Sequence, residues 1–185
     1  QSSWDPDFVS MTYGAGGSTK EPTLAAVRRM IGDAGLDTAA HLTCVDASKQ
    51  EVRDVVEDFR KAGVRRIVAL RGDPISGMGT PYMPHPEGFS DTADLVRMLV
   101  EYGDMDVSVS AYPEKHPESP DLAADIQTLK RKADAGAARA LSQFFFDNDI
   151  FESYLEKVRA AGVSIPVVPG IMPIQNLTCL LYTSD

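Results

Sequence analysis

Five glycines recur along the chain, each at the end of a segment with helical spacing. They are Gly35, Gly63, Gly103, Gly136 and Gly162. A glycine at this place is typical of the left-handed turn that ends a helix, because glycine lacks the Cβ atom that disfavours a positive φ. A short β-branched or aromatic run follows each of them. Strands that alternate with helices in this way indicate repeated βα units and a parallel sheet.

Six strands and five helices are predicted from this pattern. The strands are expected at residues 8–13, 38–43, 66–70, 107–112, 138–146 and 165–171. Apolar residues at helical spacing, such as Leu24, Val27 and Ile31, predict helices that each turn one apolar stripe toward the sheet. Capping boxes at residues 18–21 and 48–51 predict where two of the helices begin.

Two α/β architectures agree with this order. One is an open doubly wound sheet, and the other is part of a (β/α)8 TIM barrel. A whole barrel needs eight strands and roughly 250 residues. On the barrel interpretation, the 185-residue chain is one domain, residues 1–185, that lacks one element before residue 1 and about two after residue 177.

Composition excludes several classes of protein. With 43% hydrophobic and 24% charged residues, the chain has the composition of a globular domain. A net charge of -9 argues against binding to nucleic acid or to anionic membranes. No apolar run reaches the roughly 20 residues of a membrane helix, and the first residues do not resemble a signal peptide. Two cysteines, Cys44 and Cys179, favour a reducing cytoplasm. We expect no metal site, because His41 and Cys44 face opposite sides of their strand.

Polar residues stand at the ends of the predicted strands. Thr12, His41, Asp73, Tyr112 and Gln143 each lie at or just after such an end. Because ligands of parallel α/β folds bind at the carboxyl ends of the strands, their recurrence favours a ligand site at one shared mouth. Taken singly, each side chain could instead serve only to satisfy neighbouring backbone groups.

Charged residues next to these strand ends leave alternatives open. Arg71 and Asp73, separated by Gly72, could bind a planar or phosphorylated ligand, or could form a structural ion pair at a loop edge. The glycine-rich residues 14–17 could hold an anion or form a plain tight turn. The basic run at residues 130–132 is too short for nucleic acid but could grip a single diphosphate.

The helix predicted at residues 121–135 carries a second, polar stripe. Asp121, Asp125, Thr128 and Lys132 fall within one narrow sector at helical spacing. By default such a stripe is an exposed charged surface.

Several longer strings resemble the methylenetetrahydrofolate reductases, in sequence and in order. They are FVSMTYGA (8–15), HLTC (41–44), IVALRGD (67–73), AYPE (111–114) with HP (116–117), LKRK (129–132) with DAGA (134–137), QFFFD (143–147) and PGIMP (169–173). The resemblance covers residues 7 to about 177.

This resemblance implies a fold, a reaction and a set of contacts. The family is built on a (β/α)8 barrel, of which this chain would hold about six strands and five helices. The enzymes bind FAD and pass a hydride from NADH or NADPH, through the flavin, to 5,10-methylenetetrahydrofolate, giving 5-methyltetrahydrofolate. Contacts to FAD are implied for Thr12, Tyr13, Ala15, His41, Arg71, Gly72, Asp73, Tyr112, His116, Asp125, Arg131 and Lys132.

The resemblance implies three substrate-binding residues, which are Thr12, Asp73 and Gln143. It also implies that Asp73 and Gln143 are catalytic. A carboxylate such as Asp73 near the flavin would stabilise positive charge on the pterin. Gln143 can both donate and accept hydrogen bonds at an amide-like ring edge.

Three departures from the family affect what we expect. The family's general acid is a glutamate on the first barrel strand, which would lie upstream of residue 1, so we expect this chain by itself to be inactive. Asp91-Thr92-Ala93 stands where the family tends to have Tyr-Ala, and Thr128 stands where it has an asparagine that contacts FAD. Residues 177–185 do not resemble the family.

Two other functions remain open on the sequence. One is a non-catalytic barrel that binds a ligand, and the other is a pterin- or corrinoid-dependent methyltransferase barrel. For the reductase, we expect a cytoplasmic homo-oligomer that acts in one-carbon metabolism and methionine biosynthesis on a small folate substrate.

Overall fold

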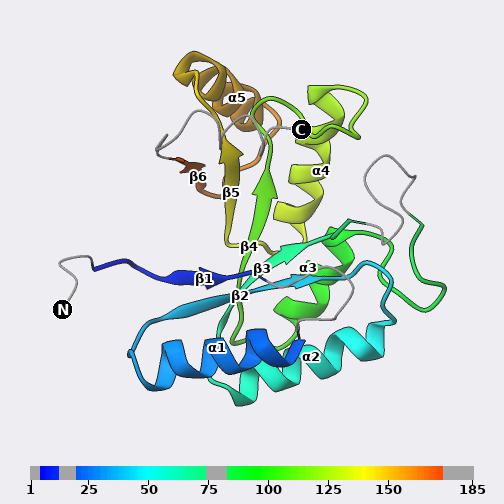
Figure 1. Cartoon of the computed structure of the whole chain (residues 1–185). Coiled ribbons are helices and arrows are strands. Elements are labelled where there is room, and N and C mark those ends of the chain that lie inside the picture. The colour runs from blue at the N-terminus through cyan, green and yellow to red at the C-terminus, as the bar shows by residue number, and fades with distance from the viewer. Residues whose placement is uncertain (1–4, 13–19, 74–82, 173–185) are drawn as a thin grey trace, which may run out of the picture.

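The computed structural model describes residues 5–12, 20–73 and 83–172. Strands and helices alternate throughout this part of the chain (Figure 1). Their order is β1 (Val9–Met11), α1 (Lys20–Gly32), β2 (Thr38–Thr43), α2 (Lys49–Lys61), β3 (Arg66–Leu70), α3 (Thr92–Val100), β4 (Asp106–Ala111), α4 (Leu122–Asp134), β5 (Arg139–Phe144), α5 (Asn148–Ala160) and β6 (Val167–Gly170). The six predicted strands are thus confirmed: two have the predicted bounds, and the ends of the other four differ by one or two residues.

The sheet is parallel, and neighbours in sequence are neighbours in space. The strand order is β1-β2-β3-β4-β5-β6, with parallel pairing at each step. Figure 1 shows that the sheet curls and that the helices lie along its outer side. A doubly wound sheet would carry helices on both faces and a strand order that reverses. The fold is therefore an incomplete TIM barrel, with six strands and five helices in the described residues.

The core lies between the convex face of the sheet and the helices. Along each strand, every second side chain is buried against this layer, as Ile67 and Ala69 are on β3. The helices contribute their apolar stripes, including the fully buried Val56 and Phe59 of α2. The alternate strand residues face the concave side of the sheet, and several of them are polar, among them Arg66, Asp106 and Arg139.

Turn and cap signals in the sequence are reproduced closely. All five glycines after the helices have a positive φ, between 65° and 107°. The capping box of Ser48 and Glu51 is present at the start of α2. The glycine-rich residues 14–17 and the first two residues of the capping box expected at 18–21 lie in the stretch 13–19, outside the described residues.

The outer strands are shorter than predicted. The strand expected at residues 8–13 spans Val9–Met11, and the strand expected at 165–171 spans Val167–Gly170. In the described sheet, each of these strands pairs with one neighbour only, so fewer ladder hydrogen bonds hold its ends. The register between β5 and β6 also shifts between Leu141 and Phe144, which ends regular pairing early.

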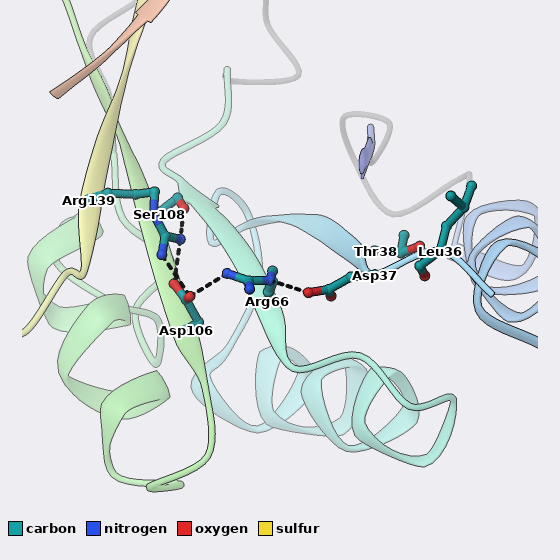
Figure 2. A network of polar contacts seen from close by, with 7 residues as sticks. All are labelled: Leu36, Asp37, Thr38, Arg66, Asp106, Ser108 and Arg139. Carbon is teal, nitrogen blue, oxygen red and sulfur yellow. Dashed lines mark hydrogen bonds and ion pairs between the residues drawn. The ribbon is translucent and has the colours of Figure 1, made fainter. Parts of the chain in front are cut away.

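A charged network ties the starts of neighbouring strands together on the concave face. Figure 2 shows Asp106 of β4 between two guanidinium groups, those of Arg66 and Arg139. Arg66 also donates to Asp37 at 2.7 Å, and Arg139 donates to the Ser108 hydroxyl at 3.2 Å. We call these five residues the Asp106 network. It links β3, β4 and β5 to the residue that precedes β2.

An aromatic ring covers the two arginines of this network. The ring centroid of Phe8 lies 5.1 Å from the Arg66 guanidinium and 5.7 Å from that of Arg139. Both distances are within the range of cation–π attraction. The segment before β1 thereby contacts β3 and β5, although β1 itself pairs with β2.

Candidate functional site

A cleft of about 450 Å³ opens at the carboxyl ends of β3 and β4, between those strands and helices α3 and α4. This is the end of a parallel sheet where ligands bind. Eight of the twelve residues implied for FAD line it together: Arg71, Gly72, Asp73, Tyr112, His116, Asp125, Arg131 and Lys132. The ends of β3 and β4 and the polar sector of α4 therefore meet at one site.

Helix α4 supplies the charged wall of the cleft. Its first turn is capped by Asp121, whose carboxylate accepts from the Ala124 amide at 2.7 Å. Asp125 and Lys132 follow on one side of the helix and are only 9% and 7% exposed. The default expectation of an exposed charged face is therefore wrong for these two residues. They face inward because the long loop before α4 folds over that side and the end of β4 lies against it.

Lys132 reaches from α4 to the end of β4. Its Nζ donates to the backbone oxygen of Ser110 at 3.1 Å and to the Ser110 hydroxyl at 3.2 Å. Burial lowers the pKa of Lys132 to about 8, although Asp125 and Asp91 favour its charged form. The ammonium group is thus partly desolvated and faces the cleft.

Asp125 positions the loop between β4 and α4. One carboxylate oxygen accepts from the His116 amide at 3.0 Å, and the other accepts from the Ser119 hydroxyl at 3.2 Å. The structure therefore gives Asp125 a role in holding this loop. Contact with a cofactor stays a prediction for this residue.

The same loop is also held from within by Lys115. This residue has a positive φ of 80°, which is uncommon for residues other than glycine, asparagine and aspartate. Its Nζ donates to the backbone oxygens of His116, Pro117 and Ser119 at 3.1, 3.3 and 2.7 Å. Three carbonyl groups thus surround one ammonium, which fixes the path of the loop.

Two aromatic rings line the cleft where this loop begins. The rings of Tyr112 and His116 meet edge to face, with centroids 4.7 Å apart. Behind them, the buried Tyr154 of α5 is hydrogen-bonded to the backbone of Tyr112, and burial raises the pKa of its phenol. Sequence reasoning missed Tyr154, because its spacing on α5 is that of an ordinary core residue.

Two ion pairs cross the cleft. Arg71 lies 2.6 Å from Glu118 of the β4–α4 loop, and Arg131 of α4 lies 2.7 Å from Asp91, the N-cap of α3. Hydrogen bonding to Arg71 lowers the pKa of the Glu118 carboxyl. The ion pair seen for Arg71 is therefore with Glu118, and not the Arg71–Asp73 pair considered from the sequence. Sequence reasoning missed Glu118, because only the folded loop brings it to Arg71.

Gly72 serves backbone packing. Its φ is 85°, and a Cβ atom built on it would lie 2.5 Å from Val45 Cγ1 and 2.9 Å from Thr43 Cβ. A side chain at this position would therefore collide with the end of β2. Packing against β2, and not contact with a ligand, is therefore what requires the glycine, although the residue does line the cleft.

The other predicted site residues lie outside the cleft. His41 is half-buried on β2, where burial lowers its pKa, and Gln143 is exposed on β5. His41 pairs in register with Val68, which pairs with Ser108 on the concave face, so His41 lies on that face. Gln143 lies within the register shift between Leu141 and Phe144. Thr12 follows β1 and is exposed. Tyr13 and Ala15 lie outside the described residues.

The arrangement brings cationic and aromatic side chains together in one cleft. Arg71, Arg131 and Lys132 present three cations in one cleft, which is the donor set that phosphate groups prefer. The concave face beside it carries polar groups at several strand ends.

Among the described residues, no group of three His, Cys, Asp or Glu side chains could hold a metal ion. In that part of the chain, no helix has both the length and the apolar character needed to cross a bilayer.

Comparisons with a family model and with known proteins agree on one family. The family model for methylenetetrahydrofolate reductase matches residues 1–184. The 5,10-methylenetetrahydrofolate reductase of Pectobacterium carotovorum subsp. carotovorum is 44% identical over 175 residues, which are 95% of this chain and 56% of that protein. Its namesake from Escherichia coli (strain K12) is 43% identical over 175 residues, or 95% of this chain and 57% of that protein. The chain thus spans about half the length of these relatives.

Less similar proteins match this chain in sequence or in fold. Methylenetetrahydrofolate reductase (NADH) 1 of Arabidopsis thaliana is 38% identical over 185 aligned residues, which cover 94% of this chain and 31% of that protein. Among solved structures, a putative phosphonomutase from Burkholderia cenocepacia J2315 superposes with a TM-score of 0.62 at 14% identity, covering 93% of this chain and 73% of that one. At that identity the likeness supports the barrel fold alone.

Proposed function

Because the chain belongs to the methylenetetrahydrofolate reductase family, we propose that the full-length protein reduces 5,10-methylenetetrahydrofolate to 5-methyltetrahydrofolate with FAD and NADH or NADPH. The observation that carries the proposal is the cleft at the ends of β3 and β4, where three cations and two aromatic rings meet.

FAD fits the chemistry of this cleft. Arg71, Arg131 and Lys132 would hold its diphosphate, since guanidinium and ammonium groups are the strongest donors to phosphate. The edges of Tyr112 and His116 offer apolar surface beside these charges. When bound, FAD supplies hydride transfer between the nicotinamide and the folate.

The concave face next to the cleft would receive the reacting rings. His41, Thr12 and Gln143 stand at strand ends on or next to this face, and Asp73 lines the adjoining part of the cleft. The folate methylene group must become a cationic iminium before it accepts a hydride. The Asp73 carboxylate would stabilise that positive charge, and Gln143 would bind the pterin edge as donor and acceptor.

Replacing Asp73 tests this role. In the full-length protein, Asp73→Asn keeps the shape of the side chain and removes its charge. We expect folate-dependent oxidation of NADH to fall by about 10²-fold, since an aligned charge in an active site contributes on this order. Bound flavin should remain, because other residues supply the cations. Steady-state rates and the flavin spectrum give the two readouts.

Asp134→Asn is the matched control. Asp134 is exposed on α4, pairs with Lys130, and does not line the cleft. Its variant should keep the wild-type rate. A full-length protein that binds flavin but shows no folate-linked turnover would favour the non-catalytic barrel. An Asp73→Asn variant as fast as the wild type would exclude the role given to that carboxylate.

A further inference from the structure

The charges that line the cleft do not favour the anion proposed for it. Three cationic side chains, Arg71, Arg131 and Lys132, face four carboxylates, those of Asp73, Asp91, Glu118 and Asp125. With histidine neutral, the lining therefore carries one net negative charge, within a chain of net charge -9. A diphosphate entering this cleft would meet repulsion unless some of the carboxylates move.

Asp125 is tied to the framework. Its two oxygens accept from the His116 amide and the Ser119 hydroxyl, so moving it would release the β4–α4 loop. Two other carboxylates instead pair with guanidinium groups across the cleft. They are Glu118, 2.6 Å from Arg71, and Asp91, 2.7 Å from Arg131. We call them the two counter-ion pairs.

The two counter-ion pairs differ in how they are held. Glu118 is carried by a loop whose backbone is fixed, since its amide donates to His116 Nδ1 at 3.2 Å and Lys115 binds the carbonyl groups beside it. Its side chain is about a third exposed and can turn toward solvent without breaking the loop. Asp91 uses one oxygen to cap α3, accepting from the Asp94 amide at 3.0 Å, and the other for Arg131.

Both arginines are therefore paired before any ligand arrives. Each guanidinium has five N–H donors in a planar fork, a geometry that fits a phosphate as well as a carboxylate. A phosphate that takes the place of a carboxylate keeps the arginine paired, and the carboxylate regains its hydration. Exchange of this kind costs little at partly exposed positions, where an ion pair contributes little to stability.

We propose that Glu118 and Asp91 are exchangeable counter-ions, which hold the two arginines of the cleft until a diphosphate-bearing ligand displaces them. This inference rests on the proposed function only for the identity of that ligand as FAD. Glu118 and Asp91 would then set how tightly the cleft binds the diphosphate of the ligand. They would not change the affinity for the flavin ring.

The test compares ligands with and without the diphosphate. The full-length apoprotein would be titrated with FAD, with riboflavin, which has no phosphate, and with inorganic pyrophosphate. Flavin fluorescence and calorimetry report the dissociation constants. The variants are Glu118→Gln, Asp91→Asn, which keeps a side chain able to cap α3, and the control Glu114→Gln. Glu114 is exposed on the same loop and does not line the cleft.

Removing a counter-ion should strengthen the binding of ligands that carry a diphosphate, and of those ligands only. We expect Glu118→Gln to bind FAD and pyrophosphate about threefold to fivefold more tightly than the wild type, the effect of one partly exposed ion pair. Asp91→Asn should act in the same direction. Affinity for riboflavin should not change in either variant, and Glu114→Gln should match the wild type with all ligands.

Unchanged or weaker FAD binding by Glu118→Gln and Asp91→Asn would overturn the inference, and so would an equal gain for riboflavin, since charge would then not be the cause. If no form of the folded protein binds FAD, the proposed function fails. The pyrophosphate titration then decides the inference separately: tighter binding by the variants supports it, and no change overturns it.

Discussion

Lys132 places a buried positive charge in the cleft, and this charge lowers the stability of the fold. The ordinary pKa of 10.5 falls to about 8 because the ammonium group is buried. Below pH 8 the folded chain must keep this charge desolvated, which lowers the free energy of unfolding. Between about pH 8 and 10.5, the folded form loses its proton first and the penalty is relieved. The residue is therefore placed for binding an anion, at the expense of stability near neutral pH.

Flavin affinity should accordingly depend on pH. As pH rises from 7 to 9, Lys132 loses its proton in the free protein, and we expect the affinity of the full-length apoprotein for FAD to fall by about tenfold. Lys132→Arg keeps a charge throughout this range, so its affinity should be flat. Lys132→Met should bind weakly at both values. Fluorescence titrations at a series of pH values give the measurement, and a wild-type affinity that does not change with pH would contradict this role.

At the scale of elements, the starts of the strands are joined by charge and their carboxyl ends form the cleft. The Asp106 network spans the beginnings of β3, β4 and β5 and reaches the residue before β2 (Figure 2). In TIM barrels, residues at the amino-terminal end serve stability, and those at the carboxyl-terminal end serve function. Asp106 sits between two arginines, so its loss would leave both of them without their shared partner.

Asp106→Asn should therefore destabilise the fold without altering the ligand site. We expect a loss of about 1–3 kcal/mol in the free energy of unfolding, as for a hydrogen-bonded charge that is partly buried. Asp33→Asn is the control, because the Asp33 side chain is 74% exposed and pairs with the exposed Arg29 one turn earlier in the chain. Its effect should stay within about 0.5 kcal/mol. Urea denaturation of the full-length protein measures both. Equal stability of the two variants would mean that the Asp106 network contributes nothing.

At the scale of the whole molecule, the sequence predicted the order of elements because each depends on local signals. Apolar periodicity, the Ser48–Glu51 capping box and the glycines with positive φ are read from neighbouring residues, and all are confirmed. Pattern alone did not separate a barrel from a doubly wound sheet, since both share that local order. The strand order and the curl of the sheet decide it in favour of the barrel.

The candidate site was predictable only in part, for the same reason. Residues at strand ends meet because parallel strands end at one edge, and this brought Arg71, Asp73 and Tyr112 together as expected. The pairing of Arg71 with Glu118 and of Arg131 with Asp91 was not predictable, because it depends on how the β4–α4 loop folds and how α3 and α4 pack. The burial of Lys132 likewise follows from packing that no local pattern encodes.

The central claim is that the cleft at the ends of β3 and β4 binds FAD, and the absorbance spectrum of the purified full-length protein tests it most directly. We predict flavin bands at one flavin per chain, which are lost in a folded Arg131→Ala, Lys132→Met double variant. A folded wild-type protein that shows no flavin bands and takes up no added FAD would contradict the account.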